Sequence, residues 1–225
     1  MRSLIQFEKR SRLRFISHLD LQRFFQRALN RSNLPIAFSQ GFNPHPVMSF
    51  ASALAMGWTS QCEILDVKLS APVKRERVEA AMRAALPEDL PVVCARMVDD
   101  RFPAAMALVR YADYRITPTG EGAQATLEAV DAFLRAQSVS GVRKTKSGER
   151  EIDLRPLTAS LAREGDSLLA RLMLTERDTL KPDVLLAGLA RIAGVQTPQA
   201  RVHRLCLLGE DGAGEIAPLM ELRHA

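Results

Sequence analysis

The sequence predicts an α+β fold made of two tandem ferredoxin-like subdomains, each with the element order β-α-β-β-α-β and an antiparallel sheet. Two observations support this prediction: strand and helix patterns alternate in that order over residues 1–100, and the order recurs over residues 104–208. The charged, turn-forming stretch 99–103 lies between them, as expected at a domain boundary. With 225 residues, 47% of them apolar, the chain can form one large core or two small ones.

The first half is expected to combine short strands with two amphipathic helices. Ser17 is placed to cap the first helix, Asp20 follows three positions later as in a capping box, and Pro35 ends the helix after about Asn33. Apolar residues recur at helical spacing between them and form the stripe that faces a core. The predicted strands are 2–8, 12–16, 36–38, 47–54, 62–69 and 91–98, and the second helix spans 73–86.

The second half repeats this theme. Ser147-Gly148 separates two strand-like runs, 139–146 and 149–154, which predicts a hairpin. The other predicted strands are 108–117, 168–174 and 202–208, and the predicted helices are 124–137 and 182–192. Residues 209–225, with their glycines and acidic residues, are predicted to be a mobile tail.

Positive charge is concentrated at the start of the chain. Residues 1–50 contain 8 Lys and Arg against 2 Asp and Glu, a net charge of +6. The remaining 23 basic and 24 acidic residues give −1 over residues 51–225. This asymmetry favours an anionic partner such as RNA, and a solvated charged face is the alternative explanation.

Cysteine content and hydropathy argue against several classes of protein. Cys62, Cys94 and Cys206 are far apart and odd in number, which argues against a disulfide framework and for a reducing compartment. The tight thiolate spacing of iron–sulfur proteins is absent, and no cofactor is predicted. No apolar run approaches the roughly 18 residues of a membrane span, and the first residues lack a signal-peptide pattern. We therefore expect a cytoplasmic protein with no membrane contact.

The densest group of unusual polar residues lies between Ser39 and Pro46. A Gly, an Asn, a His and two Pro within six residues predict a rigid turn that presents amide, imidazole and hydroxyl groups. In the predicted topology this loop and the start of the first helix can lie at the same end of the sheet, so that His18 and His45 would approach each other. The candidate binding residues of this region are Arg14, His18, Asp20, Arg23, Arg27, Ser39, Gln40, Gly41, Asn43, His45 and Ser49.

Basic and aromatic residues near this loop suit RNA. Arg23, Arg27 and Arg31 fall at i, i+4 and i+8 on one helix face, where they can follow a phosphate backbone with Lys9, Arg10, Arg12 and Arg14. Ferredoxin-like sheets often stack bases on aromatic rings, although the aromatic signature of the RRM is absent. The candidate stacking residues are Phe15, Phe38, Phe42, Phe50 and Trp58.

A second basic patch lies on the predicted hairpin. It comprises Arg143, Lys144, Lys146 and Arg150. Such a hairpin suits a nucleic-acid groove, and a charged edge that prevents aggregation is the alternative explanation.

No catalytic motif identifies a reaction, because GxSxG, P-loop and GxGxxG patterns are all missing. His18 lies at a helix N-terminus, which disfavours a protonated imidazole, so it is expected to be neutral. A neutral imidazole can act as a general base, a metal ligand or a hydrogen-bond partner. His18, Asp20, His45 and Glu63 have metal-binding side chains, but their dispersed spacing matches no local motif, and no metal site is predicted.

One set of residues matches a known family pattern. It comprises Arg14, Phe15, 17–21, Arg27, Ala28, Pro35, 39–46, Ser49, Phe50, Gly57, Glu63 and Asp66. On these residues the chain resembles the radical SAM-linked protein family, an uncharacterised bacterial family encoded beside, or fused to, a radical SAM enzyme. The match is dense over residues 9–70 and looser to about residue 208. It departs at Val47-Met48, where the family is often more basic, and before Arg12, where a glycine is missing.

The resemblance implies a setting and a partner but no established activity or catalytic residue. It implies a separately encoded radical SAM protein as partner, near ribosomal and RNA-processing genes. Our first hypothesis is an accessory protein that binds RNA or presents a substrate in RNA or ribosome modification. A second is a metal-independent endoribonuclease that uses His18 or His45 as general base on a ribose 2′-hydroxyl, by fold-level analogy with CRISPR repeat-processing nucleases. A third is a purely structural protein-interaction module.

Overall fold

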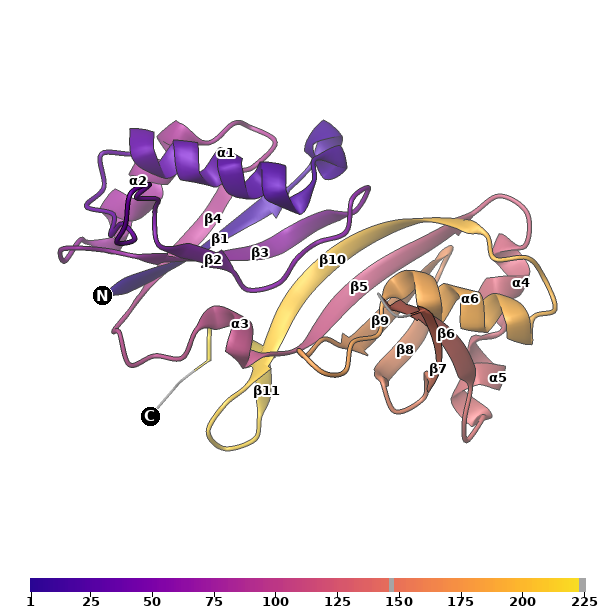
Figure 1. Ribbon diagram of the computed structural model, residues 1–225. Helices are drawn as coiled ribbons and strands as arrows, with labels where there is room; N and C mark the ends of the chain where they lie inside the picture. Colours follow the sequence, from indigo (N-terminus) through magenta and orange to yellow (C-terminus); the bar gives the residue numbers. More distant parts are fainter. Residues whose placement is uncertain (146–147, 223–225) are drawn as a thin grey trace. The chain divides into compact units, whose positions relative to one another are not determined.

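The computed structural model describes residues 1–145 and 148–222, and it contains two compact units (Figure 1). Among the described residues, the first unit comprises residues 1–109 and 207–222, and the second comprises residues 110–206 without the two that are not described. Both units combine helices with antiparallel strands, so the predicted α+β class is confirmed.

The sheet of the first unit is built around its N-terminal strand. Strand β1 lies between β4 and β3, β2 pairs with β3, and these pairings are all antiparallel. Helices α1 and α2 cover one face of this sheet (Figure 1). The elements are β1 (Arg2–Lys9), η1 (Ser11–Phe15), α1 (His18–Arg31), β2 (Met48–Phe50), β3 (Thr59–Lys68), α2 (Arg75–Ala85), β4 (Val92–Val98) and α3 (Ala105–Leu108).

An aromatic cluster joins α1 to the sheet. The ring of Phe7 on β1 lies 4.6 Å from that of Phe25 on α1, and Phe25 lies 5.5 Å from Phe50 on β2 (centroid to centroid). Leu65 of β3 and Met82 of α2 belong to the same buried core. Burial of such large side chains supplies most of the stabilisation, about 1.5–3 kcal/mol each.

The predicted first helix is confirmed, including its cap. Ser17 Oγ accepts the backbone N–H of Asp20 at 3.1 Å, as the capping box requires. The helix ends where Ser32 Oγ donates to the carbonyl of Leu29 at 2.7 Å, and Asn33 then adopts a positive φ of 54°. Asparagine tolerates this left-handed conformation better than most residues.

Three predicted strands of the first unit are wrong or too long. Residues 12–15 belong to the 3-10 helix η1 instead of a strand, and Ile16 follows its end. The chain turns at Ser11, where φ is 45°, and the carbonyl of Arg14 accepts the backbone N–H of Gly57 at 2.7 Å. The predicted strand 47–54 is shortened to β2, and 36–38 contributes only the isolated bridges of Ile36 with Leu69 and of Phe38 with Pro46.

The strands that run through the second unit are neighbours in the order β10-β5-β9-β8; β9 pairs antiparallel with both β5 and β8, and β6 and β7 form a separate hairpin. Its elements are β5 (Val109–Thr119), α4 (Ala123–Glu128), α5 (Val130–Arg135), β6 (Ser140–Thr145), β7 (Gly148–Asp153), β8 (Thr158–Glu164), β9 (Ser167–Met173), α6 (Pro182–Ile192) and β10 (Gln199–Glu210).

The predicted hairpin is confirmed as β6 and β7, whereas β8 was not predicted from the sequence. In β8 only Thr158 and Leu161 are buried, so the alternation that identifies a strand is weak. The hairpin lies on α6: a Cβ on Gly141 of β6 would lie 2.4 Å from Leu154 Cδ2, and Gly188 of α6 faces the same leucine. Predicted helix 124–137 is divided into α4 and α5 at Ala129.

The chain after Gly209, which we predicted to be a mobile tail, is folded into the first unit as far as the structure describes it. Strand β11 (Ile216–Pro218) pairs antiparallel with β10, with Leu208 opposite Pro218. Leu219 and Leu222 are each 1% exposed. Burial of these two leucines stabilises the segment.

Within residues 1–145 and 148–222, none of the helices is both long and apolar enough to cross a membrane.

Candidate nucleic-acid interface

The two polar residues at the start of α1 have structural contacts. His18 is exposed, and its ring lies edge-on to the buried Phe50 with centroids 5.3 Å apart. Asp20 Oδ2 accepts the hydroxyl of Ser17 at 2.7 Å, and Oδ1 lies 3.5 Å from Arg23 Nη1. His18 therefore covers part of the aromatic core, and Asp20 is engaged in capping α1.

The loop from Ser39 to Pro46 is tied at its base by Ser39 and His45. Ser39 Oγ accepts the backbone N–H of His45 at 3.2 Å and lies 2.9 Å from His45 Nδ1. The backbone N–H of Ser39 donates to the carbonyl of His45 at 2.9 Å. Gly41 has a φ of 128°, which favours glycine. The exposed tip consists of Gln40, Gly41, Phe42 and Asn43.

His18 and His45 have separate contacts, and no interaction among the described residues joins them. His18 contacts Phe50, whereas Pro46, the neighbour of His45, is bridged to Phe38. Phe50 follows Pro46 by four positions, about 13 Å of extended chain at 3.3 Å per residue.

The outer face of α1 carries three exposed arginines, Arg23, Arg27 and Arg31. Arg27 Nε donates to the carbonyl of Arg23 at 3.3 Å, and Arg31 Nη2 donates to the carbonyl of Ala85 at 3.3 Å. Within the part of the chain that the structure describes, neither Arg27 nor Arg31 pairs with a carboxylate. Their charges therefore remain available to an anion from outside.

The arginines before α1, in contrast, have carboxylate or aromatic partners. Arg10 pairs with Glu8, and Arg12 Nε lies 3.1 Å from Asp89 Oδ2. Arg14 is half-buried, with its guanidinium carbon 4.5 Å from the ring centroid of Phe15. Arg14 and Phe15 thus form a cation–π pair, and the Phe15 side chain is 58% exposed.

Three of the five candidate stacking residues are exposed. Phe42 is 105% exposed at the loop tip, Phe15 is 58% exposed and Phe38 is 46% exposed. Phe50 belongs to the core and Trp58 is half-buried. Phe42 therefore presents its whole ring to solvent at the tip of the loop.

Lys9 is not part of the basic surface, although the sequence analysis counted it there. It is 1% exposed, and Nζ lies 3.4 Å from the carbonyl oxygen of Arg14 and 3.3 Å from that of Ile16. Burial lowers the pKa of Lys9, and the charge of Glu63 opposes this effect. Its position on the same strand face as Ile5 and Phe7, at period two, could have identified it as buried.

Ser49 and Asp66 lie opposite each other on β2 and β3, and Ser49 is exposed. Asp66 accepts both Nε and Nη2 of Arg2, at 3.0 and 2.8 Å, and the backbone N–H of Ala105 at 3.2 Å. Arg2 also donates to the carbonyl of Pro103 at 2.8 Å. Asp66 therefore anchors the segment after β4, which is a structural role.

The hairpin is less purely basic than its sequence suggests. Arg143 lies opposite Arg150, a like-charge pair that is unfavourable without an anion, but Lys144 lies opposite Glu149. Ser140 Oγ is hydrogen-bonded to Glu151 on the neighbouring strand. Lys146 lies outside the described residues.

Metal-binding and thiol groups are dispersed. Among the described residues, no group of three or more His, Cys, Asp or Glu is placed to hold a metal ion. All three cysteines are free thiols. Burial, with the nearby charge of Glu79, raises the pKa of the Cys94 thiol, which makes it a poor nucleophile at neutral pH.

Residues 2–182 match a family described as an uncharacterised protein conserved in bacteria, DUF2344. The chain belongs to this family. The DUF2344 match includes the α1 face, the Ser39–Pro46 loop and the hairpin, and it ends at Pro182, the first residue of α6. No curated protein matches the chain.

Proposed function

We propose that this protein binds single-stranded RNA, as a cytoplasmic accessory protein that presents RNA to a separately encoded radical SAM enzyme. The observation that carries the RNA part is the surface of the first unit, where α1 leaves arginines without carboxylate partners and the loop exposes Phe42. Single-stranded RNA is bound by cationic surfaces that follow the phosphates and by aromatic rings that stack on bases.

The arginine face and the loop are linked through one cavity. Asn30 lies three residues after Arg27 on α1, and Phe38 immediately precedes the loop; both line this cavity. A strand that crosses from Arg27 to Phe42 would therefore meet polar and aromatic groups along its way. The hairpin, with Arg143 opposite Arg150, is a second candidate contact for phosphate.

The radical SAM partner is supported by the family resemblance of residues 9–70. The three cysteines lack the spacing of a cluster site, so the radical chemistry would belong to the partner. Co-purification of the tagged protein with the radical SAM protein encoded beside it tests this part. Failure to co-purify at low salt, with or without RNA, would contradict it.

We also infer a ferredoxin-like arrangement for each unit. In the first, the order β1-α1-β2-β3-α2-β4 combines with β1 between β4 and β3 and with β2 on β3. In the second, the strands β10-β5-β9-β8 occupy the equivalent order, with the hairpin inserted before β8. Ferredoxin-like sheets serve as RNA-binding platforms in several protein classes, which is compatible with the proposal.

RNA affinity measured by fluorescence anisotropy tests the proposal, with labelled single-stranded and hairpin RNA at two salt concentrations. We expect affinity for single-stranded RNA to fall steeply with salt, because bound phosphates release counterions. The double variant Arg23→Glu/Arg27→Glu should weaken binding at low salt by at least about tenfold. Arg135→Glu/Arg191→Glu is the matched control, since it makes the same charge change on exposed helix residues of the second unit.

Equal losses in the two double variants would mean that only net charge matters and would contradict the proposed surface. Absence of RNA binding at low salt would favour the protein-interaction module. That alternative predicts a complex with the radical SAM protein that survives a high-salt wash.

A second candidate function, a metal-independent endoribonuclease, is favoured by the setting of His45. Ser39 Oγ lies 2.9 Å from Nδ1 and orients the exposed ring, while Nε2 has no hydrogen-bond partner among the described residues. A neutral imidazole held in this way can accept a proton from a 2′-hydroxyl. RNA cleavage in EDTA should then be lost in His45→Ala and retained in His18→Ala. Cleavage that survives His45→Ala, or no cleavage at all, excludes this function.

A further inference from the structure

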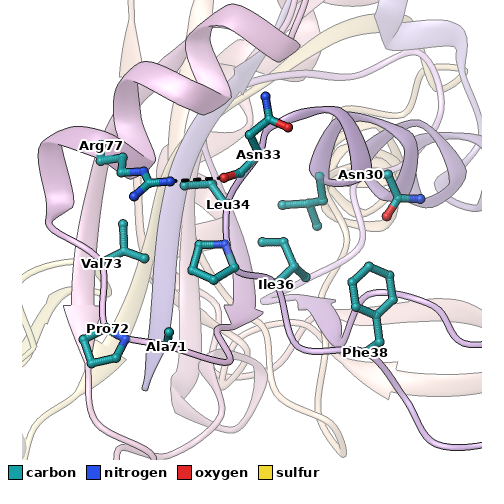
Figure 2. Close-up of a pocket in the computed structure, with 11 residues that line it drawn as sticks. Asn30, Asn33, Leu34, Ile36, Phe38, Ala71, Pro72, Val73 and Arg77 are labelled. Carbon is teal, nitrogen blue, oxygen red and sulfur yellow. Dashed lines mark hydrogen bonds between the residues drawn. The ribbon is translucent and has the colours of Figure 1, made fainter.

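The first unit contains a cavity of about 800 Å³ between α1, the segment that leads to the Ser39–Pro46 loop, and the start of α2. Figure 2 shows Phe38 and Asn30 at one end and Arg77, Val73 and Pro72 at the other. Most of the lining is apolar, and none of the eleven described lining residues is acidic. Its size lies within the range of about 300–1,000 Å³ that is typical of ligand sites.

The polar end of the cavity is set by the end of α1. Asn33, with a φ of 54°, turns the chain so that its carbonyl accepts Arg77 Nη2 at 3.3 Å (Figure 2). This bond orients the guanidinium and uses one of its five N–H donors. In the described part of the chain Arg77 has no carboxylate partner, so its charge is uncompensated at the cavity edge.

The opposite end offers a flat apolar surface. Phe38 is 46% exposed, whereas the neighbouring Ile36 is 6% exposed and closes the cavity floor. An aromatic ring that is partly open to solvent above an apolar floor suits a flat, aromatic ligand. The side-chain amide of Asn30 lies at the same end and can bond to the edge of such a ring (Figure 2).

We propose that this cavity receives an unstacked nucleobase, which stacks on Phe38, while Arg77 binds its phosphate. The inference rests on the proposed RNA binding and assigns it a specific base-binding pocket. Asn30 lies seven residues after Arg23 on α1, about 10 Å along the helix, so the pocket continues the arginine face. An apolar side chain of a protein partner would need no cation at the cavity edge, which is why a nucleotide fits better.

Titration of the protein with AMP, GMP, CMP and UMP tests the pocket directly, with isothermal titration calorimetry or ligand-observed NMR as the measurement of binding. We expect saturable binding of at least one nucleotide and no comparable binding of ribose 5-phosphate, which lacks the base. Phe38→Ala should weaken this binding by about 5- to 100-fold, the range found for loss of one base–aromatic stack. Arg77→Gln should weaken it by roughly tenfold or more, as for a charged hydrogen bond to phosphate.

Matched controls are available on the same elements. Leu19→Ala removes an exposed apolar side chain of α1 outside the cavity, and Arg75→Gln removes an exposed charge of α2 that does not line it. Both should leave nucleotide affinity unchanged. Because Phe38 and Arg77 are partly exposed, their replacement should also leave the thermal unfolding midpoint nearly unchanged, and circular dichroism checks this.

The outcomes separate this inference from the proposed function. Salt-dependent RNA binding without saturable nucleotide binding overturns the pocket and leaves the RNA proposal standing. Saturable nucleotide binding without RNA binding supports the pocket and contradicts the proposed RNA binding. Equal losses in Phe38→Ala and Leu19→Ala, or ribose 5-phosphate binding as tight as that of AMP, would also overturn the inference.

Discussion

Helices α1 and α2 cover the same face of the first sheet, and each carries three arginines, but they use them differently. Their inner faces are alike: Phe25 of α1 and Met82 of α2 are both fully buried. On α2, Glu79 accepts the backbone N–H of Ala95 at 2.9 Å and Arg83 Nη2 at 3.1 Å, and it lies 3.8 Å from Arg75.

The outer face of α1 lacks such a carboxylate. Its acidic residue, Asp20, is engaged by Ser17 at the N-terminus of the helix. Arg27 and Arg31 donate only to backbone carbonyls among the described residues. Glu79 therefore holds α2 to β4 and lies close to two of its three arginines, whereas Arg27 and Arg31 of α1, like Arg77 of α2, have no carboxylate partner among the described residues. A cationic face that the fold does not use is the better candidate for a partner.

The largest expected effect tests whether the two helices are equally important for stability. Phe25→Ala removes a ring that packs against Phe7 and Phe50, and Met82→Ala removes a side chain from the same core. Losses of about 3–5 kcal/mol and about 2–5 kcal/mol in the free energy of unfolding are expected, because each leaves a cavity. Urea denaturation measures both. A cost below about 1 kcal/mol for either variant would show that its helix is not part of one common core.

Replacing the carboxylate of Glu79 on α2 should lower the free energy of unfolding more than replacing that of Asp20 on α1. The backbone N–H of Ala95 is the largest cause of a lowered pKa at Glu79, and Arg83 and Arg75 add to it. Glu79→Gln should therefore cost about 1–2 kcal/mol at pH 7. Asp20→Asn, on a residue that is 60% exposed, should cost less.

The pH dependence of this effect has a definite sign. Because the folded pKa of Glu79 lies below its ordinary value of 4.5, the carboxylate stabilises the fold above that value. The contribution is lost as the pH falls through the lowered pKa. Chemical denaturation between pH 3 and 7 should show wild type and Glu79→Gln converging at the acidic end. A difference that is constant over this range would contradict the assignment.

The sequence predicted α1 well because its cap and its apolar stripe are local features. It could not predict that Arg10 and Arg12 are paired while Arg27 is not, since Asp89, the partner of Arg12, is 77 residues away. The same limit applies to Lys9, whose burial depends on the turn at Ser11 and on Glu63 of another strand.

One part of the candidate site could be predicted from the sequence and another could not. The Ser39–Pro46 loop was identified from its own residues, because glycine, proline and an internal Ser–His contact define a turn without distant partners. The cavity beside it was not predicted, because its lining comes from two stretches of the chain, 29–38 and 71–77, that only the fold brings together. The exposed state of Phe42 likewise required the fold, since a phenylalanine in the sequence is more often buried.

The smallest expected effect is the most specific test of the difference between the helices. Arg27→Gln and Arg75→Gln each remove one exposed charge, and both should change the free energy of unfolding by less than about 0.5 kcal/mol. For single-stranded RNA, Arg27→Gln should reduce the slope of log affinity against log salt by about 0.7, the value for one phosphate contact. Arg75→Gln should leave that slope unchanged, because Arg75 already lies 3.4 Å from Glu76. Equal slopes for the two variants would mean that RNA does not distinguish α1 from α2, and the unpaired arginines would then be no guide to the binding surface.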